Sequence, residues 1–75
     1  MSKVKLKRVR ASLGLSQQAL SDLSGVSKPT IVEAEKGRPM RLLTAYAILK
    51  ALNSARSQQG LSELTIDDID WNIGE

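Results

Sequence analysis

The segment from Leu15 to Gly37 reads LSQQALSDLSGVSKPTIVEAEKG, and it contains start and stop signals for two short helices. Ser16 and Ser27 each precede a helix-compatible run, and a serine hydroxyl at that position accepts hydrogen bonds from the free N–H groups of the first turn. Gly25 and Gly37 follow the two runs, and glycine ends helices because it enters the left-handed conformation without strain. The spacing predicts two capped helices joined by a tight turn.

These helices are expected at about residues 17–24 and 28–36, with about three residues between them. Pro29 lies in the first turn of the second helix, where its missing N–H removes no hydrogen bond. Helices joined by so short a turn cross steeply, so the second one protrudes from the surface. A protruding helix of this size fits the major groove of DNA, which is about 12 Å wide.

The composition of the 75-residue chain excludes several kinds of chemistry. It contains no cysteine and no histidine, which removes disulfides, thiol catalysis, Cys/His zinc sites and imidazole acid–base catalysis. Trp71 and Tyr46 are the only aromatic residues, too few for a platform that stacks single-stranded bases. No apolar run approaches the roughly 20 residues that span a membrane, and the lysine-rich N-terminus lacks the apolar stretch of a signal peptide. We expect a single, soluble, cytoplasmic protein without cofactor, metal ion or enzymatic activity.

Charge is distributed unevenly along the chain. All 11 lysine and arginine residues lie within residues 1–56 beside three acidic residues, which gives this part a net charge of +8. Residues 57–75 hold five acidic residues and no cation, a net charge of −5. A cationic body suits a polyanionic partner. The acidic residues of the tail lack the spacing of a calcium loop, so we expect a solvated cap or a surface that meets another subunit.

The remaining apolar pattern is helical, and no segment is typical of a strand. Helices are expected at residues 3–13 and at about 42–52, with room for an extension of the latter to Gln59. Thr65 is typical of an N-cap and predicts one last helical turn. The predicted core residues on the apolar faces are Leu6, Val9, Leu13, Leu20, Leu23, Ile31, Ala34, Leu43, Ala47, Ile48, Ala51 and Leu52.

The motif resembles that of the phage repressor and Cro-type helix-turn-helix family of DNA-binding proteins. The matching positions are Arg10, the run Gly14-Leu15-Ser16-Gln17, Leu20, the turn Gly25-Val26-Ser27, Ile31, Glu35 and Gly37. The resemblance covers about residues 4–52. It implies an all-α, compact repressor-like domain of four to five helices, with its helix-turn-helix at about residues 17–36. It also implies a transcriptional regulator, typically a repressor, that binds double-stranded DNA sequence-specifically.

In this family the second helix of the motif reads bases through its outward positions, which correspond here to Lys28, Pro29, Thr30, Val32 and Glu33. Lys28 can donate to guanine O6 and N7, and Glu33 can accept from the N4 amine of cytosine. Pro29 and Val32 offer apolar surface to a thymine methyl group. We therefore expect these residues to set the sequence preference.

A second set of residues is expected to contact the DNA backbone, which orients a protein without reading sequence. This set consists of Gln17, Gln18, Ser27, Lys36, Arg38 and Arg41. Gln17 resembles the family glutamine that binds a phosphate and supports the recognition helix. For Arg10 and Glu35, the resemblance implies a structural ion pair between the first and third helices.

Two positions depart from the family pattern. Ser21 stands where the family prefers alanine, and its small side chain preserves the close helix packing. Ala34 stands where a large aliphatic residue is usual, and such a truncation costs about 2–5 kcal/mol if nothing fills the gap. We expect Trp71 or Ile66 of the tail to fill it.

The chain divides into a helix-turn-helix domain at residues 1–60 and an acidic tail at residues 61–75, which packs either on the domain or on a dimer partner. One domain makes few base contacts, so we expect a homodimer on a near-palindromic site, with half-sites roughly 34 Å apart. The candidate subunit contact, equally suited to an intramolecular core, consists of Leu42, Tyr46, Leu49, Ile66, Ile69 and Trp71.

Three alternatives stay open. The protein would be the antitoxin of a toxin–antitoxin pair if its acidic tail wraps a small basic protein while the body binds the operator. It would be a protein-interaction module if its helix-turn-helix has lost affinity for DNA. It would be a fragment of a longer regulator if further domains belong to the chain.

Overall fold

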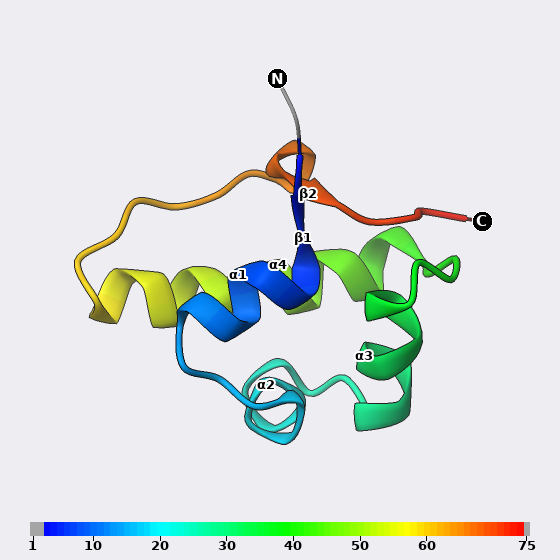
Figure 1. Ribbon diagram of the computed structural model, residues 1–75, viewed down its shortest axis with the longest axis horizontal. Coiled ribbons are helices and arrows are strands. Elements are labelled where there is room, and N and C mark those ends of the chain that lie inside the picture. The colour runs from blue at the N-terminus through cyan, green and yellow to red at the C-terminus, as the bar shows by residue number, and fades with distance from the viewer. Residues whose placement is uncertain (1–2, 75) are drawn as a thin grey trace.

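The computed structural model describes residues 3–74; Met1, Ser2 and Glu75, the last of which belongs to the expected tail, lie outside the described part. Four α-helices make up most of this part (Figure 1). The elements are β1 (Val4–Lys5), α1 (Leu6–Ser12), α2 (Gln17–Ser24), α3 (Lys28–Glu35), α4 (Leu42–Gln58), the 3-10 helix η1 (Ile66–Asp68) and β2 (Ile69–Asp70). The fold is largely all-α, as predicted. Among the described residues, no helix combines the length and apolarity needed to cross a membrane.

Local signals set the ends of α2 as predicted. The Ser16 hydroxyl accepts a hydrogen bond from the Ala19 N–H (2.9 Å), and Gly25 ends the helix with a φ of 75°. A side chain at Gly25 would be strained in that left-handed conformation. Ser27 is the N-cap residue of α3, as predicted, but the expected hydrogen bond from a backbone N–H is not formed, because the Ser27 hydroxyl pairs with the hydroxyl of Thr30 (2.8 Å).

The core lies between α4 and the other helices, and α2 packs against both α3 and α4. Its buried apolar residues are Leu6, Val9, Leu13, Leu20, Ile31, Ala34, Met40, Ala45, Ile48, Leu49, Ala51, Leu52 and Ile69. Nine of the twelve predicted core residues are among them. Of the other four, Met40 and Ala45 were not predicted, and Leu49 and Ile69 were expected either at a subunit contact or in an intramolecular core.

Two predicted core residues, Leu23 and Leu43, are exposed instead. Only one stripe of a helix, with the spacing i, i+3, i+4, i+7, faces the interior. In α4 that stripe runs through Ala45, Ile48, Leu49 and Leu52, and Leu43 lies on the opposite side with 81% of its surface exposed. The sequence contains enough leucine for two stripes, so composition alone did not identify the buried one.

The strands were not predicted. β1 pairs with β2 in parallel, with Val4 opposite Ile69 and Lys5 opposite Asp70. The first helix consequently begins at Leu6 rather than near residue 3. A hydrogen bond from Lys5 (2.6 Å) joins the two strands and lowers the pKa of the Asp70 carboxyl. Two-residue strands carry no detectable alternation, and these exist only because the tail returns to the N-terminus.

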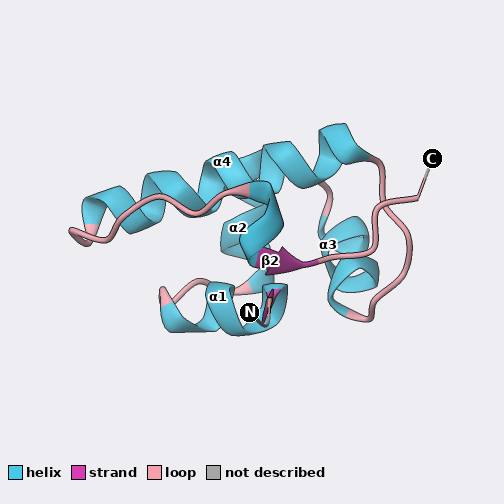
Figure 2. Cartoon of the chain, turned by 90° about the horizontal axis from the view of Figure 1, so that it is seen from above, coloured by secondary structure: helices cyan, strands magenta, loops and turns pink. Residues whose placement is uncertain are grey.

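The tail folds back along α4 and contributes to the core (Figures 1 and 2). The side-chain amide of Asn53 in α4 binds both the N–H and the carbonyl of Leu64 (2.8 and 2.9 Å). Thr65 precedes η1, as predicted, and the Trp71 indole donates to the Ile66 carbonyl (2.9 Å). Ile69 is completely buried. One continuous core therefore includes residues from both expected parts of the chain.

The tail should stabilise the fold through Ile69. The substitution Ile69→Ala should lower the free energy of unfolding by about 2–5 kcal/mol, because it leaves a cavity in the core. Ile73→Ala, the same change at a tail residue that is 38% exposed, should cost about 1 kcal/mol or less. Urea unfolding followed by the fluorescence of Trp71 measures both, and equal losses would contradict the role assigned to Ile69.

Candidate nucleic-acid interface

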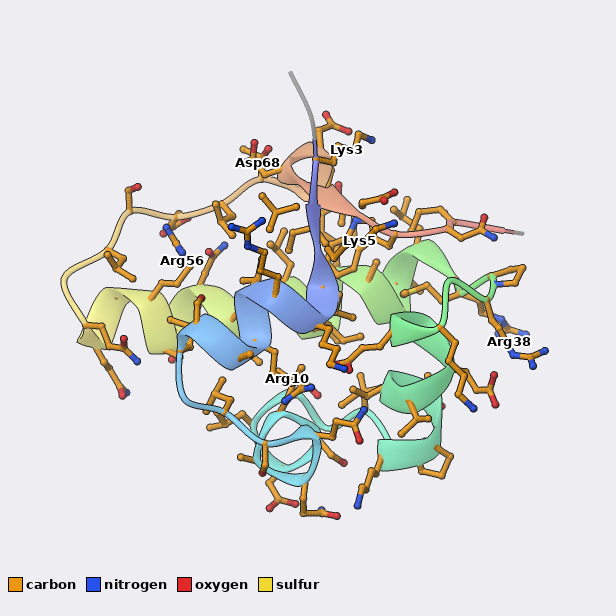
Figure 3. All side chains as sticks on the ribbon, viewed as in Figure 1. Lys3, Lys5, Arg10, Arg38, Arg56 and Asp68 are labelled. Carbon is orange, nitrogen blue, oxygen red and sulfur yellow. The ribbon has the colours of Figure 1, made fainter. Side chains whose placement is uncertain are left out.

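A polar network lies beneath α3 and connects it to α1 and α2. The Arg10 guanidinium donates two hydrogen bonds to the Glu35 carboxylate (2.6 and 3.1 Å) and one to the Leu15 carbonyl (2.8 Å). The Gln17 amide donates to the same carboxylate (3.1 Å). The ion pair that the resemblance implies is thus formed, and Arg10 points from α1 toward the two other helices (Figure 3).

This network is largely removed from solvent, since the side chains of Arg10 and Glu35 are 11% and 5% exposed. The hydrogen bond to Glu35 raises the pKa of Arg10 above its ordinary value, so the guanidinium stays charged. Charges this sheltered are tolerated when their polar atoms are bonded. Within residues 3–74, every buried side-chain nitrogen or oxygen has a hydrogen-bond partner. The network therefore holds the end of α3 in one orientation.

Ser21, which departs from the family pattern, also supports the motif. Its hydroxyl donates to the Val26 carbonyl (2.6 Å) and so links α2 to the turn before α3. Alanine could not make this bond. The serine therefore adds a polar tie while keeping the side chain small enough for close packing.

The outward face of α3 consists of the residues expected to contact bases. Lys28, Pro29 and Glu33 are exposed, whereas Thr30 and Val32 are half-buried. Ile31 and Ala34 face the core from the other side of the same helix. The face of α3 that was expected to read bases is thus accessible, with Val32 partly covered.

The residues expected at the DNA backbone lie around this face. Gln18, Ser27, Lys36, Arg38 and Arg41 are exposed. Gln17 is half-buried, and its bond to Glu35 uses one of the two N–H donors of its amide, which leaves the other for a phosphate.

The structure joins two residues to which the sequence assigned separate roles. Arg38, expected at the backbone, forms an ion pair with Glu33, expected at a base. Both side chains are well exposed, and Arg38 extends from the edge of the molecule (Figure 3). The pair neutralises the one carboxylate on the outward face of α3 while the protein is free of DNA.

Comparison with protein families identifies the chain. A family model described as helix-turn-helix matches residues 6–59, which include α1 to α4. The chain belongs to the helix-turn-helix family, of the Cro/C1 type. No curated protein and no solved structure matches it significantly.

Because the chain belongs to this family, it is a DNA-binding regulator. The match ends before the tail, so the strand pairing of β2 and the contacts of residues 60–74 lie outside the family pattern. Within residues 3–74, no group of three or more His, Cys, Asp or Glu side chains could hold a metal ion.

Trp71 and Ile66 do not line the space beside Ala34, although one of them was expected to fill it. Two surface hollows border Ala34, with volumes of about 400 and 140 Å³, and neither is lined by Trp71 or Ile66. Met40 lines the larger hollow and is itself buried. The sequence offered no signal for Met40, because it follows Pro39 in a loop outside any periodic segment.

The protein should lose more unfolding free energy when one partner of the Arg10–Glu35 pair is removed than when both are removed. Arg10→Met leaves a buried carboxylate without its charged partner and should cost about 3–5 kcal/mol of unfolding free energy. The double variant Arg10→Met/Glu35→Leu removes both charges and should cost less. Urea titrations test this, with Lys7→Met on the exposed face of α1 as the control; a single-variant loss no larger than that of the double variant would contradict it.

Proposed function

We propose that this helix-turn-helix protein is a transcriptional repressor that places α3 in the major groove of a specific DNA sequence. The observation that carries the proposal is the outward face of α3, which is exposed while the network of Arg10, Gln17 and Glu35 holds the helix from behind. A base-reading helix must be rigid, because hydrogen bonds to base edges depend on orientation. Repression is the simplest outcome, since occupancy of a duplex excludes other proteins from it.

The side chains of α3 support contacts with more than one kind of base. Lys28 would donate to guanine O6 or N7, and Glu33 would accept from a cytosine N4 amine. Pro29 and the accessible part of Val32 would contact a thymine methyl group, and Thr30 would bind an adjacent base or phosphate. Glu33 would also reject sequences that bring a phosphate or an acceptor close to it.

The cations around α3 support the same placement of this helix in the major groove. Lys36, Arg38 and Arg41 would bind phosphates on either side of the groove, together with the polar side chains of Gln17, Gln18 and Ser27. The tail runs along the edge of the molecule away from α2 (Figure 1), and Asp68 lies on that edge (Figure 3). Asp70 is already paired with Lys5 of the same chain, so this carboxylate is matched by a cation without a basic partner protein.

Selection of duplexes from a random pool tests the proposal. The protein should enrich one motif, and Lys28→Ala should relax the preference at one base position, at a cost of about 1–3 kcal/mol in discrimination. Arg41→Ala should weaken binding to all sequences alike and reduce the salt slope of log K by about 1. The two variants are matched controls for each other, and the absence of any enriched motif would refute the proposed function.

We also propose that the repressor binds DNA as a homodimer. The subunit contact expected from the sequence needs revision, because Leu49 and Ile69 are buried in the chain's own core and Trp71 packs against it. Leu43 and Tyr46 remain exposed one turn apart on α4, at 81% and 47%. We place the revised contact there, since adjacent exposed apolar residues favour association.

The dimer predicts a specific effect of charge on this patch. Leu43→Glu should convert two bound copies per palindromic duplex into one, because a carboxylate would have to be buried at the contact. Leu61→Glu changes another exposed leucine, in the loop after α4, and should leave two copies bound. Sedimentation velocity with a duplex whose half-sites lie about 34 Å apart measures the stoichiometry. One bound copy of the wild-type protein would refute the dimer.

A further inference from the structure

We infer that the end of the tail, residues 72–74, is a positioning element for the loop between α3 and α4. This loop, residues 36–41, carries the three cations among the proposed phosphate-binding residues, Lys36, Arg38 and Arg41, so the inference rests on the proposed function. Its consequence is that the tail, which lies outside the family pattern, sets how tightly the protein holds DNA without setting which sequence it prefers.

Backbone hydrogen bonds tie the loop to the tail. The Met40 N–H donates to the Asn72 carbonyl (2.8 Å), and the Met40 carbonyl accepts from the Gly74 N–H (2.9 Å). The Asn72 side chain adds a hydrogen bond to the Gly37 carbonyl (3.2 Å). Met40 is buried, with both of its backbone polar groups used by the tail. Three hydrogen bonds from residues close to the C-terminus thus fix the loop at two points.

The tail is itself firmly attached before it reaches the loop. Ile69 is fully buried, β2 pairs with β1, and the Trp71 indole is bonded to the Ile66 carbonyl. Figures 1 and 2 both show the chain continuing from β2 past the end of α3. The tail therefore links β1 and the core to this loop, whose other backbone hydrogen bonds among the described residues go to the two flanking helices.

The positions of two arginines depend on where the Met40 backbone lies. Arg38 and Arg41 lie on either side of Met40 in the chain, and the Arg41 carbonyl accepts the first hydrogen bond of α4 from Ala45 (3.1 Å). A shift of Met40 would therefore move the backbone from which both arginines extend. Phosphate contacts carry no sequence information, so such a shift should weaken all sequences alike.

Gly74 offers a way to disturb this contact alone. A Cβ at Gly74 would lie 2.8 Å from the Cβ of Pro39, an atom of a rigid ring that cannot swing aside. Alanine at position 74 must therefore displace Pro39 or the end of the tail, and either shift disturbs the contact between the tail and the loop. At Gly60, by contrast, a Cβ would meet nothing within 4 Å, although its φ of 75° makes alanine strained. Gly60→Ala is thus a matched control that disturbs the fold without touching the loop.

The experiment compares the wild type, Gly74→Ala and Gly60→Ala on the duplex enriched from the random pool and on a scrambled duplex of equal length. Gly74→Ala should weaken binding to both duplexes by about 3- to 10-fold and reduce the salt slope by about 1, with the enriched motif unchanged. Gly60→Ala should lower the midpoint of urea unfolding and leave affinity and salt slope unchanged at a temperature where all three proteins are folded.

A second variant and a second readout cover the case in which Gly74→Ala folds poorly. Asn72→Ala removes the hydrogen bond to the Gly37 carbonyl and should produce a smaller loss of the same kind, with faster hydrogen exchange at the Met40 amide. Unchanged affinity and salt slope in both tail variants, or an equal loss in Gly60→Ala, would overturn the inference while leaving the proposed function intact. Failure of the wild type to enrich a motif would refute the proposed function and, with it, this inference.

Discussion

The buried bond between Arg10 and Glu35 is the constraint on which the functional arrangement depends. It joins the first helix to the end of the third, and Gln17 and the Leu15 carbonyl add the start of the second helix to the same network. Desolvated charges impose direction, because a displaced partner leaves a charge without compensation. Apolar packing around Leu20 and Ile31 brings the helices together, whereas this network defines the angle at which α3 is presented.

Outside this network, the residues proposed to read bases and those proposed to bind phosphates lie on neighbouring but different segments of the chain. The outward face of α3 holds the side chains proposed to distinguish bases, and the loop after it holds the cations proposed to bind phosphates. The Arg38–Glu33 ion pair connects the two sets. The end of the tail holds the same loop through the backbone of Met40. Recognition is therefore supported from within the family motif, and the proposed backbone contacts are supported in part from outside it.

The helix-turn-helix could be predicted because its signals are local. The Ser16 cap, the Gly25 turn and Pro29 in the first turn of α3 act over a few residues, and all three lie where they were expected. The Arg10–Glu35 pair followed from the family resemblance rather than from spacing. The assignments of Leu23 and Leu43 to the core were wrong, because a short leucine-rich helix has more than one apolar stripe and only packing selects the buried one.

What the sequence determined by itself was therefore the helix-turn-helix, its caps and the positive charge around it, since each depends on near neighbours or on composition. Only the tertiary structure decided that the tail would complete the core, pair β2 with β1 and hold Met40. These contacts join residues more than 30 positions apart, and two-residue strands have no periodicity of their own. Their formation depends on how the whole chain closes, which no local pattern encodes.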